Sequence, residues 1–244
     1  MREKGLNKVQ LQYIAIIAMV IDHTAWGFVE FMTPLGYMMH LVGRLTLPIM
    51  CFFIAEGFSH TANIRKYVLR MVLFAAVAVI PFYLFFHEEY GYRQNIIFDE
   101  LLALLALCAI EEKRVPKPVR ILMVAGLMCV SALIGGWVIM PIVYALVFHI
   151  ENSFAQKAKK FCLFTVILYV VLFVAITLNG TYHLFTYDWN VIQMLYLLGF
   201  MLALIPLSFY NGQRGEARFG RYFFYLFYPA HFMVLWGIKC LLAK

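Results

Sequence analysis

The chain has 244 residues, of which 64% are hydrophobic and only 14% charged, whereas soluble globular proteins are about half apolar and a quarter charged. This composition excludes a soluble domain, and it excludes a disordered chain, which needs low hydrophobicity. The net charge of +7 would suit a nucleic-acid partner in a soluble protein. In a membrane protein, the positions of the basic residues indicate instead how the chain is oriented in the bilayer. Five cysteines, an odd number, lie within apolar runs and are expected to be reduced: Cys51, Cys108, Cys129, Cys162 and Cys240.

Taken in chain order, the apolar runs predict an all-α, polytopic membrane helix bundle. About 20 apolar residues cross the hydrocarbon of a bilayer as a helix. Charged residues and glycines divide the chain into about nine such transmembrane helices, which fill a single domain over residues 1–244. Only Gly135-Gly136 separates the fifth from the sixth, so one long tilted helix is an alternative. The expected spans are 9–29, 41–60, 67–86, 95–111, 119–134, 137–150, 161–179, 189–210 and 222–242.

Loop charge predicts a plasma-membrane protein with its N-terminus in the cytoplasm. Lys and Arg collect in cytoplasmic loops, and nine spans place most of them on one side. No cleavable signal is expected, because the first apolar run carries Asp22-His23 and lacks a small-residue cleavage site. The basic surplus is therefore a matter of topology, and nucleic acid is not an expected partner. The cytoplasmic set is Arg2, Lys4, Lys8, Arg65, Lys66, Arg70, Lys113, Arg114, Lys117, Arg120, Lys157, Lys159, Lys160, Arg214, Arg218 and Arg221.

Polar residues inside the first two spans are candidates for function, because ionisable groups in a membrane are costly. Asp22 and His23 lie about 21 Å from the cytoplasmic start of their helix, in its outer third. His40 and Arg44 are four residues apart on one face of the second span, and Arg44 is expected about one turn inside the outer boundary. An ion pair or a shared site with Asp22 is expected. The alternatives are an interfacial cap for Asp22-His23, and snorkelling to the outer headgroups for both Arg44 and His40.

Three further polar residues lie in the fourth span, and one in the last. Asn95 and Asp99 share a face with Glu100 alongside, and either acid, Asp99 or Glu100, is expected to balance the charge of Arg44 or to take part in chemistry. His231 is expected at mid-membrane depth on an aromatic face, where packing is the alternative to a functional role. A cytoplasmic rim would offer Arg forks to a phosphate-bearing ligand, although positive-inside charge alone explains its bases; it comprises Glu56, His60, Arg65, Lys66 and Arg70.

Several of these residues belong to strings that occur together in one known family. The strings are Asp22-His23, Gly43-Arg44, Leu47-Pro48-Ile49, Glu56-Gly57-Phe58, His60-Thr61, Tyr67 with Arg70, Pro81-Phe82, Asn95 with Phe98, and residues 223–229 with His231. In this order they resemble the TraX family, membrane proteins named for an acetylase of conjugative pilin. The resemblance implies transfer of acetyl from acetyl-coenzyme A to an acceptor outside the cytoplasm. It carries over Asp22, His23, Arg44, Glu56, His60, Arg70, Asn95 and His231.

The leading hypothesis is therefore an acetyl-CoA-dependent O- or N-acetyltransferase that uses no metal. His23 would be the general base, because its ordinary pKa lies near neutrality. Asp22 would orient the imidazole or stabilise its charged form, and Arg44 would set the local field or stabilise charge on the carbonyl oxygen. Arg65, Lys66 and Arg70 would hold the coenzyme A phosphates.

Direct transfer and an acetyl-histidine intermediate are both compatible with these residues. The acceptor would be an extracytoplasmic glycan, a surface polymer or a pilin. Two rival hypotheses are a proton-coupled secondary transporter and a non-catalytic assembly role.

Overall fold

In a computed structural model, the described residues form helices and no β-strand, and one isolated β-bridge pairs Leu6 with Tyr210. The chain divides into two compact units. Unit 1 comprises Met1–Ile49 and Ser153–Glu216, and unit 2 comprises Met50–Asn152 and Ala217–Lys244. An all-α chain is thus confirmed. The structure describes residues 5–31, 33–90, 94–178, 196–216 and 222–242.

Unit 1 is built on two packed N-terminal helices, and local capping explains where each begins. The helix α1 (Lys8–Phe28) starts after Asn7, which forms a capping box with Gln10. The helix α2 (Pro34–Gly43) starts with a proline after Thr33, whose hydroxyl accepts a hydrogen bond from the Gly36 N–H. Unit 1 also contains α8 (Phe154–Leu178), the 3₁₀ helix η1 (Tyr196–Ala203) and α10 (Leu204–Ser208).

The second expected span starts earlier than predicted and is interrupted. It begins at Pro34 rather than at residue 41, α2 ends at Gly43, and α3 (Thr46–His60) follows after a short turn. Pro48 lies in the first turn of α3, where its missing N–H is not needed for an intrahelical bond, so the break falls just before it. Pro34–His60 is together long and apolar enough to cross a membrane.

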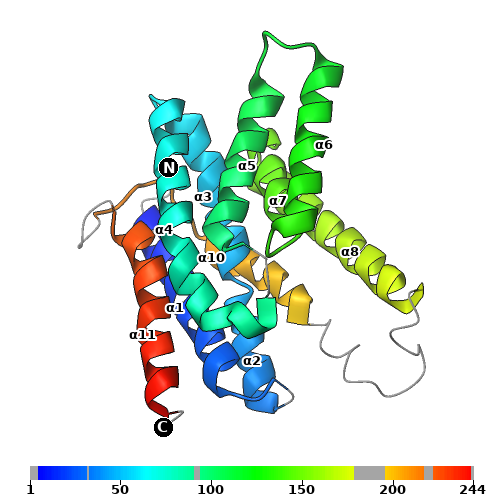
Figure 1. Cartoon of the computed structure of the whole chain (residues 1–244). Coiled ribbons are helices and arrows are strands. Elements are labelled where there is room, and N and C mark those ends of the chain that lie inside the picture. Colours follow the sequence, from blue (N-terminus) through cyan, green and yellow to red (C-terminus); the bar gives the residue numbers. More distant parts are fainter. Residues whose placement is uncertain (1–4, 32, 91–93, 179–195, 217–221, 243–244) are drawn as a thin grey trace. The chain divides into compact units, whose positions relative to one another are not determined.

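Unit 2 is organised around α5 (Ile96–Glu111), which packs against α4 (Ile64–Tyr90), α6 (Lys117–Ile134) and α7 (Met140–Ile150) (Figure 1). Most of the α5 side chains are buried. The C-terminal helix α11 (Phe223–Leu242) packs against α4. An aromatic cluster joins these two helices and comprises Phe82, Phe85, Phe86 and Phe232.

The helices α6 and α7 run in opposite directions along α5. The end of α6 meets the start of α5, where the Gln94 N–H donates to the Ile134 carbonyl at 2.8 Å. The end of α7 meets the end of α5, where His149 lies 3.1 Å from Glu111. The fifth and sixth predicted spans are therefore separate helices, and the alternative of one long helix is wrong.

Five stretches of the described residues are long and apolar enough to cross a membrane: Lys8–Phe28, Pro34–His60, Ile64–Phe86, Lys117–Ile134 and Phe223–Leu242. Met140–Ile150 and Leu198–Ser208 are apolar but shorter. A count of nine crossings stays a prediction, and part of the eighth predicted span, 189–210, lies outside the described residues.

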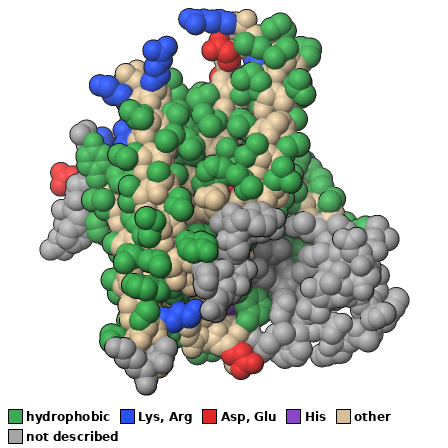
Figure 2. All heavy atoms as spheres, viewed as in Figure 1, with side chains coloured by type: hydrophobic (Ala, Val, Ile, Leu, Met, Phe, Trp, Pro, Cys, Tyr) green, Lys and Arg blue, Asp and Glu red, His purple; other side chains and the backbone are tan. Residues whose placement is uncertain are grey.

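The surface of the molecule fits a lipid environment. Hydrophobic side chains cover much of the face drawn in Figure 2, and Leu122 and Leu133 of α6 are about 70% exposed (71% and 68%). In unit 2, Lys and Arg side chains gather at the end that holds the start of α4 and the α5–α6 turn (Figure 2). The chain therefore has the character of a membrane protein with one strongly basic end in unit 2.

Candidate functional site

A buried ionic cluster joins α1 and α2 in unit 1. The Asp22 carboxylate accepts two hydrogen bonds from Nη2 of Arg44, at 2.7 and 2.6 Å, and lies 2.8 Å from Nδ1 of His40. The three residues are 6%, 2% and 0% exposed, respectively. The ion pair expected between Asp22 and Arg44 is thus present, and it is shielded from water.

Local sequence explains how these side chains meet. Gly43 gives α2 close access to α1, because a Cβ at this position would collide with the side chain of Asp22. Arg44 is the C-cap of α2, four residues after His40, and its Nε donates to the His40 carbonyl at 3.1 Å. The helical i,i+4 spacing therefore delivers both a cation and an imidazole to the same carboxylate.

Aromatic side chains enclose this cluster. The His40 ring centroid lies 4.6 Å from those of Trp26 and Phe31, and the Arg44 guanidinium lies 5.9 Å from the Phe200 ring centroid. In such surroundings a charge pair is only weakly screened. The sequence favoured snorkelling for His40, but the residue is fully buried and contacts Asp22; its spacing from Arg44 was the available signal.

His23 occupies the next position on α1 and is half-buried. The described hydrogen bonds of Asp22 go to Arg44 and His40, and neighbouring residues of a helix do not share a face. Asp22 therefore acts on His23 through its charge. The early start of α2 also corrects the depth of Arg44, which lies about 15 Å along the helical segment that begins at Pro34 rather than one turn from its start.

Asn95 and Asp99 of unit 2 hold helices in place. Asn95 caps α5 by accepting from the Ile97 and Phe98 N–H groups, and its amide donates to the Ala75 carbonyl of α4 at 3.0 Å. Asp99 accepts hydrogen bonds from the backbone N–H groups of Gly136 and Trp137, at 2.9 and 3.2 Å. These contacts give Asp99 a structural role that the sequence did not predict, the anchoring of the α6–α7 turn.

A second polar group of residues lies where α4, α5 and α11 meet. The Arg70 guanidinium is 5.2 Å from the Tyr67 ring centroid and 5.9 Å from that of Tyr225. Glu100 of α5 is 5% exposed and interacts electrostatically with both tyrosines. His231 of α11 is also buried; its Nδ1 is 3.2 Å from the Phe227 carbonyl and its ring packs against Tyr228 and Phe232, as a packing residue would.

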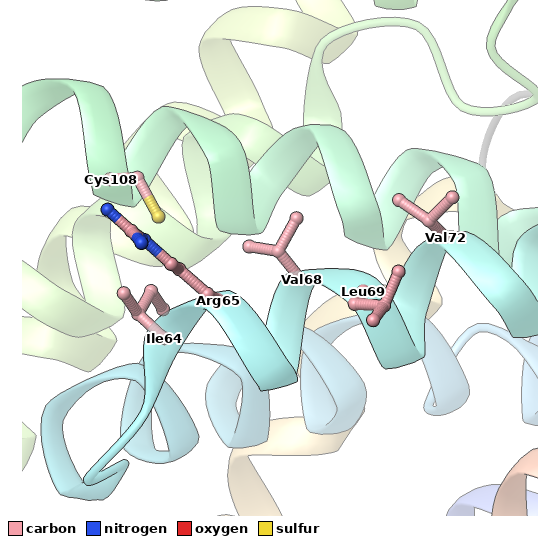
Figure 3. Close-up of a pocket in the computed structure, with 6 residues that line it drawn as sticks. All are labelled: Ile64, Arg65, Val68, Leu69, Val72 and Cys108. Atoms are coloured by element: carbon pink, nitrogen blue, oxygen red, sulfur yellow. The ribbon is translucent and has the colours of Figure 1, made fainter.

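The expected cytoplasmic rim residues come together at the α3–α4 turn of unit 2. Nδ1 of His60 lies 2.8 Å from the carbonyl oxygen of Glu56, and Gly57 packs on Tyr67. Arg65 and Lys66 are exposed, and Arg70 is half-buried. Arg65 also lines a groove between α4 and α5 that is otherwise mainly apolar (Figure 3). All five cysteines are free, and no group of three or more potential metal ligands occurs among the described residues.

Comparisons with known proteins identify the family. The sequence matches the TraX protein family over residues 7–239, almost the whole chain. The chain belongs to the TraX family. This TraX family member is also 33% identical, over 254 aligned positions covering 99% of both sequences, to a probable fimbrial assembly protein FimC, serogroup H1, of Dichelobacter nodosus. No solved structure matches it. The resemblance recognised in the motifs is therefore confirmed at the level of the family.

Proposed function

We propose that this TraX family protein is an integral membrane acyltransferase that moves an acetyl group from cytoplasmic acetyl-coenzyme A to an acceptor on the extracytoplasmic side. The observation that carries the proposal is the Asp22–Arg44–His40 cluster with His23 beside it on α1. Charges in membrane helices cost several kcal/mol unless paired and are typically functional. The chain belongs to the TraX family, and the reaction class is the one that the resemblance to this family implies.

In the proposed reaction, His23 removes a proton from the acceptor hydroxyl or amine as that group attacks the thioester carbonyl. The new bond joins the acceptor oxygen or nitrogen to the acetyl carbon, and the carbon–sulfur bond breaks. The proton then passes from the imidazolium to the departing thiolate, so that the products are the acetylated acceptor and free coenzyme A. We assign the base to His23 rather than His40, because a base must reach its substrate and His40 is fully enclosed.

The buried cluster would act on His23 at a distance. A fixed negative charge on the adjacent residue, Asp22, favours the imidazolium that forms when His23 takes the proton. Arg44 and His40 hold that carboxylate in place, so no reorganisation is needed during the reaction. A role for Arg44 on the substrate carbonyl oxygen is less favoured, since its described hydrogen bonds go to Asp22 and the His40 carbonyl.

The basic end of unit 2 is the proposed site for the coenzyme A phosphates. Lys66 is exposed and Arg70 is half-buried at the start of α4, with Glu56 and His60 beside them on α3. Arginine forks and lysine ammonium groups both bind phosphate. This assignment requires the start of α4 to face the cytoplasm, as the loop charges predict.

The acceptor is proposed to be a surface glycan, a surface polymer or a pilin. The name of the Dichelobacter nodosus relative, a probable fimbrial assembly protein, favours the pilin more strongly than the motifs alone do. A secreted fibre subunit presents an N-terminal amine and side-chain hydroxyls, and either group can attack a thioester. The bilayer and acetyl-coenzyme A are the other expected partners.

The purified protein should be tested for cofactor binding and transfer together. Acetyl-coenzyme A is expected to raise the unfolding temperature, and label from its acetyl group should move to a pilin or cell-envelope fraction with release of free coenzyme A. Lys66→Glu should abolish the thermal shift, whereas Lys159→Glu, an exposed charge reversal on α8, should not. No binding and no label transfer with either fraction would contradict the proposal.

A proton-coupled transporter is the second candidate, because Glu100 is a buried carboxyl within the apolar helix α5. Such groups form proton relays in transporters. Solute uptake driven by a pH gradient in proteoliposomes, without consumption of acetyl-coenzyme A, would favour this candidate over the acyltransferase.

A further inference from the structure

A groove with a volume of about 380 Å³ lies between α4 and α5. Figure 3 shows Arg65 extending toward the α5 residue Cys108 at one end, while the apolar side chains of α4 continue along the groove away from it. Its lining consists of Ile64, Arg65, Val68, Leu69, Val72 and Cys108. The groove therefore combines one cationic end with an apolar path along two turns of helix.

The position of the groove indicates an occupant that comes from the bilayer. Leu69 is 69% exposed and Val72 is 44% exposed, and both belong to the apolar stretch Ile64–Phe86, which is long enough to span a membrane. Arg65 lies at the very start of that stretch, where its side chain would contact the lipid headgroups. A ligand that fits must place a negative charge at Arg65 and an apolar chain beside the valines and leucine.

We propose that this groove binds one anionic phospholipid, with its phosphate at Arg65 and an acyl chain along Val68, Leu69 and Val72. Charge complementarity supports this occupant, because none of the described residues that line the groove is acidic. The same end of unit 2 also carries Lys66, Lys113 and Arg114, all exposed. Basic clusters at a membrane boundary attract anionic headgroups. Coenzyme A also carries phosphates, but its adenosine and pantetheine are polar and match an apolar lining poorly.

The proposal is tested by titrating the purified full chain in detergent with phosphatidylglycerol or phosphatidylcholine of identical acyl chains and counting bound lipids by native mass spectrometry. One phosphatidylglycerol should bind more tightly than phosphatidylcholine. Arg65→Ala should weaken that preference about tenfold, as expected for loss of a charge-assisted hydrogen bond. Val68→Trp should fill the groove and weaken both lipids.

Matched controls distinguish the effect of a substitution in the groove from the general effect of removing a charge or adding bulk elsewhere. Lys159→Ala removes an exposed cation from α8 of unit 1, and Val119→Trp adds the same bulk on α6, where the valine is 45% exposed. Neither should change lipid binding. Bound phosphatidylglycerol should also slow alkylation of the Cys108 thiol, measured by peptide mass, relative to the exposed Cys240.

Equal binding of the two lipids, or an Arg65→Ala variant with unchanged preference, would overturn the proposal. Protection of Cys108 by acetyl-coenzyme A instead of by phosphatidylglycerol would assign the groove to the cofactor and overturn it as well. Lipid binding is measured without acetyl-coenzyme A, so this proposal and the acyltransferase proposal succeed or fail independently.

Discussion

At the scale of single residues, the decisive contact is the ion pair between Asp22 and Arg44 in unit 1. Both side chains are more than nine-tenths buried, and each supplies the partner that the other needs in apolar surroundings. Removing one partner from a buried pair leaves an uncompensated charge, while replacing both with apolar residues is often close to neutral. The two residues should therefore be strongly coupled energetically.

We expect Asp22→Ala and Arg44→Met each to lower the free energy of unfolding by ~3–5 kcal/mol. The double variant should lose less than the sum of the two, with a coupling energy of ~1–3 kcal/mol. Equilibrium unfolding in mixed micelles measures all three variants. Strict additivity would show that the pair contributes no mutual stabilisation.

Gly43 offers a second test at the same contact. An alanine Cβ there would lie 2.7 Å from Oδ1 of Asp22, well inside van der Waals contact. Gly43→Ala should cost ~1–3 kcal/mol of stability, as overpacking does, and should weaken the Asp22–Arg44 contact. Gly126→Ala in α6 is the matched control, because nothing lies within 4 Å of its added Cβ. That variant should be neutral or slightly stabilised, and a loss equal to that of Gly43→Ala would refute the close approach as the cause.

The sequence predicted the Asp22–Arg44 pair, with Asp99 and Glu100 as the other candidate partners of Arg44, but it did not predict the surroundings of the pair. Two opposite charges in neighbouring apolar segments are costly unless they are paired, which favours this contact. The contact between Asp22 and His40 depends on how far α2 extends and on the positions of Trp26 and Phe31. These are tertiary features that hydropathy does not encode.

At the scale of helices, Asp99 fixes the turn between α6 and α7. Its carboxylate binds two successive backbone N–H groups, those of Gly136 and Trp137. Gly135 is required beside it, because a Cβ there would collide with the same carboxylate. Gly135-Gly136, which in the sequence only weakly separates the fifth and sixth predicted spans, is thus part of a turn that binds the Asp99 carboxylate.

Asp99→Ala should release this turn. We expect faster amide hydrogen exchange over residues 135–139 and a stability loss of ~1.5–3 kcal/mol, the range for hydrogen bonds to charged groups. Glu100→Gln is the matched control, since Glu100 is adjacent and buried, but the described hydrogen bonds of the turn go to Asp99. Unchanged exchange in Asp99→Ala would show that other contacts hold the turn.

Helix bounds were predictable where charged residues flank an uninterrupted apolar run. The predicted spans 119–134 and 222–242 match α6 and α11 to within two residues at each end. The predicted start of the second span was wrong because Thr33 and Pro34 begin a helix through capping. Capping is a local signal that a search for apolar stretches does not detect. Pro48 marked the break between α2 and α3, but not its exact position.

At the scale of the whole molecule, the charge distribution predicts the orientation of the chain in the membrane, and this orientation has to be measured. The α5–α6 turn lies at the basic end of unit 2. The end of α11 lies at the other end, where Lys239 is 5.7 Å from the Phe85 ring near the end of α4. The positive-inside rule predicts that the α5–α6 turn faces the cytoplasm.

An impermeant maleimide should therefore label Cys240 in intact cells and Lys113→Cys only after permeabilisation. Both positions are exposed, so accessibility within the fold does not confound the comparison, and peptide mapping distinguishes the two thiols. The opposite labelling pattern would invert the proposed orientation and remove the basic end from the side where coenzyme A is found.

The central claim, a His23-mediated acetyl transfer beside a buried charged cluster, is tested most directly by comparing His23→Ala with His40→Ala. Both variants are assayed for transfer of labelled acetyl from acetyl-coenzyme A, with unfolding temperature and cofactor binding measured in parallel. His23→Ala should stay folded, bind cofactor and lose transfer by ~10²–10⁴-fold, the usual contribution of a general base. His40→Ala should mainly lose stability. A folded, cofactor-binding His23→Ala variant that transfers acetyl at the normal rate would contradict the account.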